Sequence, residues 1–93
     1  MKPYDIDFKP SVEKDLETLP KTLVTRIMNK IEGLALDPFP RQVIKLSVSE
    51  QLYRIPVGEY RIVYEVDIRE RHIIIHYIRH RREVYRKLSK RKT

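Results

Sequence analysis

Two hydrophobic periods follow one another along the chain. Residues 4–8, Tyr-Asp-Ile-Asp-Phe, alternate apolar and acidic side chains, which predicts a short strand with one buried face. Val12, Leu16 and Leu19 then recur at helical spacing and predict a helix of about nine residues, which begins at Pro10 because proline is tolerated in a first helical turn. The N-terminal segment is therefore a strand followed by a helix.

A second helix is expected after Pro20, which also suits a first helical turn. Apolar residues form one stripe along it and charged residues cover the other side, as expected for a helix that packs on a core. The stripe contains Leu23, Ile27, Ile31 and Leu34, widened by Val24, Met28 and Ala35, and the charged side contains Lys21, Arg26, Lys30 and Glu32. The helix ends before residues 37–40, Asp-Pro-Phe-Pro, because proline disfavours the helical conformation in the residue before it.

The second half of the chain changes to a period of two. Strands are predicted at 43–46, 52–57, 60–66 and 72–79, with a tight turn at Gly58-Glu59, a polar turn at 67–71, a short helix at 83–90 and a frayed basic tail at 88–93. The run 52–79 is a three-stranded antiparallel meander, joined by 43–46 on one side. Together these elements predict a single α+β domain over residues 1–93: an N-terminal strand, a helical hairpin and a meander (β-α-α-β-β-β-α), with the helices on one face of the sheet.

Composition narrows the class of protein. Cysteine is absent, so disulfides and thiolate metal sites are excluded. The three histidines have no carboxylate at a spacing that favours a metal site, and no glycine-rich phosphate loop occurs, so no metal and no cofactor is expected. Because the chain has neither an apolar run of about 18 residues nor a signal-peptide core, we expect a cytoplasmic protein without a membrane partner.

Charge is concentrated at the C-terminal end. Residues 69–93 contain ten Lys and Arg against two acidic residues, a balance of +8, whereas residues 1–68 contain ten against eleven, a balance of −1. The sum is the net charge of +7, and a fold by itself does not require such asymmetry. The pattern predicts a polyanionic partner, and the histidine and tyrosine within the basic run indicate stacking or acid–base chemistry as well.

The strand patterns also predict where the basic residues lie. Alternation puts the set Tyr60, Ile62, Tyr64 and Val66 on the core face, and a second set, Ile73, Ile75, Tyr77 and Arg79, on one face of the last strand. If the helices cover the core face, Arg54, Arg61 and the segment 79–85 meet on the opposite face as a basic trough for single-stranded RNA. The alternative is a solvated sheet face with ordinary arginines.

His80 and Tyr85 are the other side chains of chemical interest in the basic run. A histidine at the end of a strand serves either as a general acid or base near neutral pH or as a structural hydrogen-bonding group. Tyr85 either stacks on a base, orients a phosphate or anchors the terminal helix to the sheet. The pattern by itself leaves these alternatives open.

Two segments resemble one family. Residues 52–66 are Leu-Tyr-Arg-Ile-Pro-Val-Gly-Glu-Tyr-Arg-Ile-Val-Tyr-Glu-Val, and residues 80–86 are His-Arg-Arg-Glu-Val-Tyr-Arg. Both resemble the RelE branch of the RelE/ParE toxin superfamily, and the resemblance extends over residues 4–88. It implies a type II toxin–antitoxin mRNA interferase, which is a small toxin that enters the ribosomal A site and cuts the mRNA codon there.

The resemblance also implies a mechanism and its residues. The ribose 2′-hydroxyl attacks the adjacent phosphate, which leaves a cyclic phosphate and a free 5′-hydroxyl. Arg61 matches the transition-state phosphate clamp, Arg81 the arginine that neutralises charge, and Tyr85 the tyrosine that orients the attacked nucleotide. His80 is the candidate for acid–base work, and the residues expected to bind RNA or phosphate are Arg54, Lys45, Arg79, Arg82 and Arg86. Guanidinium groups suit this reaction because they bind phosphate bidentately.

Pro56 departs from the family pattern. It stands two positions after Arg54, where a well-known member has a lysine proposed as the base, and proline accepts no proton. Lys45, His80 or ribosomal RNA then replaces the base, or the 2′-hydroxyl reacts without a strong one. Related toxins with a histidine at this strand end use it in acid–base chemistry.

Three functions are compatible with this fold. The first is a ribosome-dependent endoribonuclease, neutralised by a cognate antitoxin whose acidic or amphipathic segment covers the basic face. The second is a ParE-like toxin that inhibits DNA gyrase without cutting RNA, and the third is a catalytically decayed homologue that only binds RNA. The fold cannot decide between them, but the set Arg54, Arg61, Arg81 and Tyr85 favours the nuclease, because the gyrase-directed branch does not need it.

Overall fold

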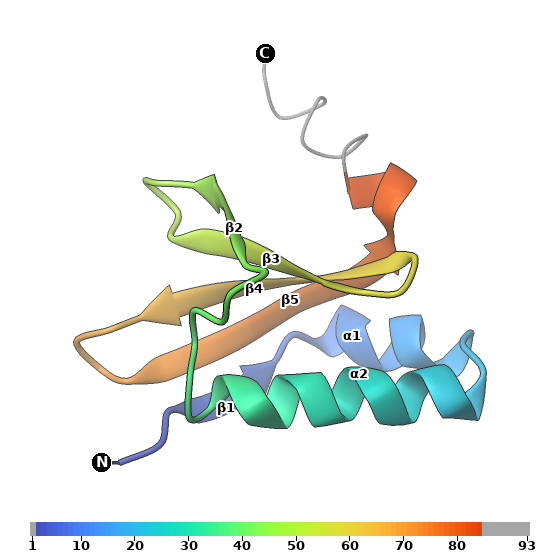
Figure 1. The fold of residues 1–93 in the computed structure, drawn as a ribbon, viewed down its shortest axis with the longest axis horizontal. Coiled ribbons are helices and arrows are strands. Elements are labelled where there is room, and N and C mark those ends of the chain that lie inside the picture. The colour runs from blue at the N-terminus through green and yellow to red at the C-terminus, as the bar shows by residue number, and fades with distance from the viewer. Residues whose placement is uncertain (1, 85–93) are drawn as a thin grey trace.

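The computed structural model describes residues 2–84, in which a strand, two helices and four further strands follow one another (Figure 1). The strands are β1 (Asp5–Phe8), β2 (Ile44–Ser47), β3 (Leu52–Val57), β4 (Tyr60–Asp67) and β5 (His72–His80), and the helices are α1 (Pro10–Glu17) and α2 (Lys21–Leu34). The predicted α+β class is confirmed, and each element predicted between residues 4 and 79 is present with bounds within two residues. β2 is a full member of the sheet, so four strands follow the helical hairpin.

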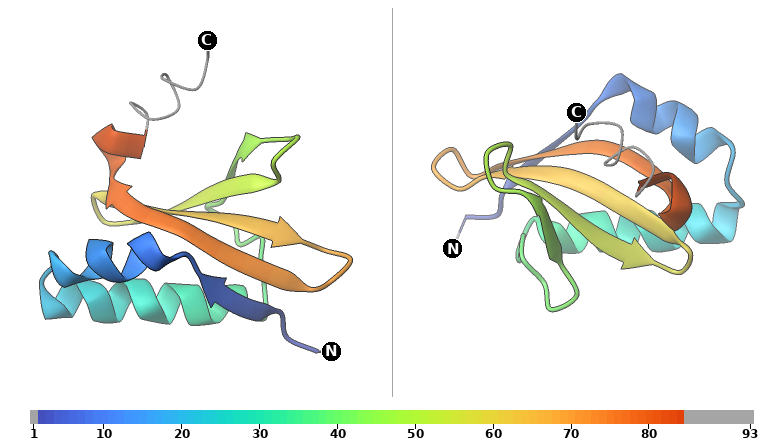
Figure 2. Two further views of the ribbon diagram at one scale, coloured as in Figure 1. Left: turned by 180° about the vertical axis from the view of Figure 1, so that it is seen from behind. Right: turned by 90° about the horizontal axis from the view of Figure 1, so that it is seen from above.

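The connection between the two helices is short, and hydrogen bonds within the last turn of α1 end that helix. Thr18 donates hydrogen bonds from its backbone N–H and its hydroxyl to the carbonyl oxygen of Asp15, at 3.4 and 2.9 Å. Pro20 then takes an extended conformation and precedes the first residue of α2. The two helices lie side by side as a result (Figure 2). Neither helix of residues 2–84 is long and apolar enough to cross a membrane.

The sheet joins the first strand of the chain to the last. Its order is β1-β5-β4-β3-β2, in which β1 runs parallel to β5 and the other neighbouring strands are antiparallel. Both helices cover one face of this sheet (Figure 1). The pairing of Tyr60 with His80 and of Arg61 with Arg79 brings four of the residues singled out in the sequence to one end of the sheet.

The main core lies between the helices and the sheet. Ile27, Ile31 and Leu34 of α2 are almost completely buried there. The remaining members of the cluster are Val12, Ile55, Val57, Ile62, Tyr64, Val66, Ile73, Ile75 and Ile78. The predicted core face of β4 is therefore confirmed.

A β-bulge changes the faces of β5. Tyr64 pairs with Ile75 and Val63 pairs with Tyr77, so that β5 has one extra residue between these pairs. Ile78 consequently takes a core position, while Tyr77 lies on the opposite face. The prediction that Tyr77 and Arg79 share a face with Ile73 and Ile75 is wrong, because the extra residue reverses the alternation beyond it.

A second, smaller apolar cluster lies on the face opposite the helices. Leu52, Val63 and Val84 are buried in it, and Leu46 and Tyr77 pack against it. Val84 belongs to a helical turn at 81–84, which stands on the side of the sheet away from α1 and α2 (Figure 1). The terminal helix predicted at 83–90 thus begins two residues earlier, and its remainder, with Tyr85, Arg86 and the tail at 88–93, lies outside the described residues.

Tyr64 connects the sheet to the segment that follows α2. Its side chain is completely buried, and its hydroxyl donates a hydrogen bond of 2.7 Å to the carbonyl oxygen of Pro38. Burial, with smaller contributions from Asp37 and Tyr53, raises the pKa of the Tyr64 hydroxyl far above its usual value. The folded structure therefore favours the protonated, neutral form of the Tyr64 hydroxyl.

Candidate nucleic-acid interface

The turn between β3 and β4 is the centre of the candidate site. Gly58 has a φ of +59°, in the left-handed region that glycine adopts without strain. Arg61 folds back onto this turn, and its Nη1 donates hydrogen bonds to the carbonyl oxygens of Gly58 and Tyr60, at 3.0 and 2.9 Å. The backbone of the turn therefore orients the Arg61 guanidinium.

Arg81 reaches the same turn from the end of β5. Its backbone N–H donates to the carbonyl oxygen of Glu59 at 2.9 Å, and its Nε lies 3.2 Å from the Glu59 carboxylate. The Arg81 side chain is half exposed and that of Glu59 more so. Two arginines far apart in the sequence are thus brought together at one two-residue turn, and one of them carries a solvated carboxylate partner.

Arg79 is held more firmly than Arg81. Its guanidinium forms an ion pair with Asp15 of α1 and a longer one, at 3.5 Å, with Glu83. The Asp15 carboxylate is largely buried and also accepts a hydrogen bond from the Ile78 backbone N–H at 3.0 Å. An RNA phosphate would have to compete with two carboxylates for Arg79, so this residue contributes more to the junction of α1 with β5 than to an open anion site.

His80 lies on the helix side of the sheet. It pairs with Tyr60, whose ring packs against the main core, and the two rings meet edge to face at 5.6 Å. Its Nδ1 accepts a hydrogen bond of 3.3 Å from the Arg82 backbone N–H, which fixes the start of the helical turn. The structure therefore does not bring the His80 ring together with Arg61, and it leaves the Arg82 side chain exposed.

Arg54 and Lys45 lie on different faces. Arg54 is 9% exposed and stands on the same face as Arg61, two residues from Pro56, the partner of Arg61 in β3. Lys45 pairs with Tyr53 on the helix side, and its Nζ lies 5.6 Å from the centre of the Tyr53 ring. Arg54 and Arg61 therefore share one face of the sheet, with Arg54 buried, whereas Lys45 lies on the other face.

Pro56 occupies a position that tolerates proline. The register of β2 on β3 ends at the pair Ile44 and Arg54, so β3 has no strand partner on that side at Pro56. A missing backbone N–H is acceptable at such a free edge. The departure from the family pattern at this position therefore fits the local backbone, although it removes an ionisable side chain.

Several charged residues of the site have no signal in the sequence pattern. Asp15 and Glu59 neutralise Arg79 and Arg81, yet the pattern predicts only a helix around Asp15 and a tight turn at Glu59. Arg26, assigned only to a charged helix face, lies against Gly58, with its terminal nitrogens 3.8 Å from where a Cβ on that glycine would stand. Tertiary contacts alone bring these groups to the arginine cluster.

Comparisons with known proteins match this fold over most of its length. The sequence model of a family described as the ParE toxin of the type II toxin–antitoxin system, parDE, matches residues 6–85. A protein of Methanocaldococcus jannaschii assigned as a RelE toxin is 30% identical over 86 residues, which make up 89% of this chain and 96% of that protein.

Solved structures of RelE toxins have the same architecture. A chain of the archaeal RelE–RelB complex from Pyrococcus horikoshii aligns with a TM-score of 0.78 at 32% identity, covering 85% of this chain and 96% of that one. A chain of the RelB–RelE antitoxin–toxin complex from Methanococcus jannaschii aligns with a TM-score of 0.70 at 28% identity, covering 87% and 96%. This protein belongs to the RelE/ParE superfamily, as a RelE-type toxin of a type II toxin–antitoxin system.

Proposed function

We propose that this chain is a ribosome-dependent endoribonuclease that cuts mRNA in the ribosomal A site and so inhibits translation in the cytoplasm. The observation that carries the proposal is the convergence of Arg61 and Arg81 on the turn between β3 and β4, at the end of the sheet face that also holds Arg54. The Arg61 guanidinium is fixed by two backbone carbonyls and the Arg81 guanidinium lies against the Glu59 carboxylate, so that two cations are positioned in advance for a phosphate that gains charge.

The reaction needs charge stabilisation above all. The mRNA 2′-oxygen forms a bond to the adjacent phosphorus, the bond from phosphorus to the 5′-oxygen breaks, and the proton lost by the 2′-hydroxyl is balanced by one gained at the leaving oxygen. Arg61 binds the non-bridging oxygens, and Arg81 exchanges its Glu59 partner for the phosphate. Each such donor typically contributes about 10²–10³ in rate.

A strong base from this chain is not part of the proposal. Pro56 has no ionisable group, and His80 and Lys45 lie on the helix side of the sheet, away from Arg61. The 2′-hydroxyl proton therefore passes to a group of the ribosome or to solvent, while the arginines stabilise the negative charge. His80→Gln tests this point: cleavage that falls less than about tenfold supports it, and a loss of about 10²–10³ assigns His80 to acid–base catalysis.

We propose a cognate antitoxin as the protein partner. The relatives from Pyrococcus horikoshii and Methanococcus jannaschii were solved as complexes of a toxin with its antitoxin. An antitoxin of this chain neutralises it by covering the arginine-bearing face with an acidic or amphipathic segment. Ribosome, mRNA and antitoxin would then compete for the same surface.

The test is primer extension on a defined mRNA, incubated with the purified protein with and without programmed ribosomes. Cuts should appear only with ribosomes, fall in the A-site codon and decrease about 10²–10³-fold in Arg61→Ala and Arg81→Ala. Arg69→Ala removes the same charge from the turn between β4 and β5, at the other end of these strands, and should cut normally. Unchanged cutting by both site variants would refute the site assignment.

One observation favours a second function. The family model that matches residues 6–85 is described as a ParE toxin, and the ParE-like alternative acts on DNA gyrase. In that case gyrase supercoiling is inhibited in vitro while mRNA on programmed ribosomes stays intact. Intact mRNA with uninhibited gyrase would instead indicate a homologue that binds RNA without cutting it.

A further inference from the structure

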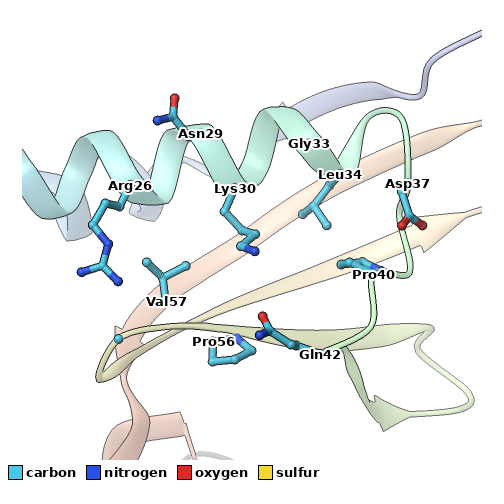
Figure 3. Close-up of a pocket in the computed structure, with 11 residues that line it drawn as sticks. Arg26, Asn29, Lys30, Gly33, Leu34, Asp37, Pro40, Gln42, Pro56 and Val57 are labelled. Carbon is cyan, nitrogen blue, oxygen red and sulfur yellow. The ribbon is translucent and has the colours of Figure 1, made fainter.

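A cleft separates α2 from the end of β3, and it borders the Gly58 turn that also holds Arg61. It has a volume of about 700 Å³ and opens to solvent between the helix, the segment after it and the turn at Gly58 (Figure 3). Its apolar walls include Leu34, Pro40 and Val57, and the residues that line it contain no aromatic ring. A cleft of this shape suits a chain of small or aliphatic residues better than a stack of bases.

Two cations of α2 face this cleft. Arg26 and Lys30 are one helical turn apart, and both side chains extend from the helix toward β3 (Figure 3). The ion pairs found within residues 2–84 include neither of them, in contrast to Arg79 and Arg81. Asp37 also lines the cleft, but its Oδ1 accepts a hydrogen bond of 3.2 Å from the Phe39 backbone N–H, and no ion pair within residues 2–84 joins it to Arg26 or Lys30. The cleft therefore keeps an excess of positive charge.

Gly33 is the third unusual feature of the cleft. It lies within α2, where glycine is less favourable than alanine because its backbone loses more freedom on folding. No heavy atom lies within 4 Å of the place where a Cβ would stand, so no contact inside the described structure requires a glycine. The absence of a side chain leaves room for another chain to approach the helix closely.

We propose that this cleft binds an extended acidic peptide segment of a partner protein, whose backbone passes over Gly33 and whose carboxylates pair with Arg26 and Lys30. From residue 26 to residue 33 the helix rises about 10 Å, which matches about three residues of an extended chain. The charges, the apolar walls and the glycine each fit such a peptide. The inference goes beyond the nuclease function and does not depend on cleavage.

The first experiment selects binders from a phage-displayed library of random dodecapeptides on the full-length protein. Recovered sequences should be enriched in Asp and Glu, and their synthetic peptides should bind about tenfold or more weakly to Arg26→Glu and Lys30→Glu. Arg69→Glu makes the same charge reversal in an exposed turn and should bind as the wild type does. Binders without acidic enrichment, or with equal affinity for all these variants, would overturn the proposal.

The second experiment uses Gly33→Ala, which the open space should accommodate without disturbing the fold. Its melting temperature should rise by about 3–6 °C, because alanine favours the helix. Peptide affinity should fall about tenfold, because the added methyl group occupies the path of the bound backbone. An unchanged affinity in this stabilised variant contradicts a peptide backbone over Gly33.

A labelled single-stranded RNA of twelve nucleotides serves as the competing ligand. If Arg26→Glu and Lys30→Glu weaken RNA binding and leave the selected peptides bound, the cleft is an RNA surface and the peptide proposal is overturned. Because peptide binding is measured without ribosomes or mRNA, its failure is distinguishable from a failure of the proposed nuclease function.

Discussion

The Tyr64 hydroxyl offers a sharp test of the fold. Tyr64→Phe removes one oxygen from a completely buried side chain and leaves the Pro38 carbonyl without its 2.7 Å hydrogen bond. The ring stays in the core, so loss of the hydrogen bond is the main cost. Leaving a buried acceptor unpaired costs about 1–3 kcal/mol, and we expect about 1.5 kcal/mol less free energy of unfolding at pH 7.

The same hydroxyl makes this difference depend on pH. Because the pKa of Tyr64 is raised in the folded protein, the folded state keeps a proton that the unfolded state releases above its ordinary pKa of about 10. The stabilisation is therefore complete below pH 10 and is lost as the pH rises. Linkage predicts a loss of about 0.4 kcal/mol at pH 10 and about 1.4 kcal/mol at pH 11 in the wild type only.

Urea unfolding followed by circular dichroism at pH 7, 10 and 11 measures both effects. The advantage of the wild type over Tyr64→Phe should shrink from about 1.5 kcal/mol to nearly zero at pH 11, because the other titrating groups are common to both proteins. Tyr4→Phe is the control, since no hydrogen bond found within residues 2–84 involves the Tyr4 hydroxyl and Tyr4 is not among the causes of the raised pKa of Tyr64. A difference that stays constant with pH would refute the reasoning about the buried hydroxyl.

Three further predictions concern the core, the helix junction and the RNA face. Ile62→Ala should cost about 2–5 kcal/mol in urea unfolding, because Ile62 is completely buried, and less than about 1 kcal/mol would mean that its surroundings collapse around the gap. Asp15→Ala should cost about 2–3 kcal/mol, because it leaves the Ile78 N–H without its acceptor and Arg79 with only the longer Glu83 ion pair. Asp15→Asn should lose less, and equal losses would contradict the ion-pair account. Glu59→Gln should tighten RNA binding and steepen the dependence of log K on log salt concentration by about one counterion, because it frees Arg81 to bind a phosphate. An unchanged slope, measured by fluorescence anisotropy, would argue against the exchange of Glu59 for phosphate at Arg81.

Local patterns determined the elements of this fold because each depends on nearby residues. The stripe that includes Ile27 and Ile31 predicts α2, and alternation predicts β4 with Ile62 and Tyr64 inside, since period and burial follow directly from backbone geometry. The asymmetric charge also belongs to the sequence alone. From these features the α+β class, the helix-covered face and a basic surface could all be predicted.

The exceptions arise where pairing overrides alternation. One extra residue in β5, His76, turns Tyr77 and Arg79 away from the core. The composition of the strand does not indicate this bulge. A bulge is set by how two strands meet, so only the paired sheet reveals it. The separation of His80 from Arg61 follows from the same register.

The sequence by itself determined the secondary structure, the burial of its apolar faces and the concentration of positive charge. Only the tertiary structure decided which arginines are available: Asp15 and Glu83 neutralise Arg79, Glu59 faces Arg81, and Arg26, beside a cleft, takes part in none of the ion pairs within residues 2–84. The physical reason is that the buried face of a helix or strand follows from the spacing of apolar residues only a few positions apart. The partner of a charge depends instead on distances between residues that are far apart in the sequence.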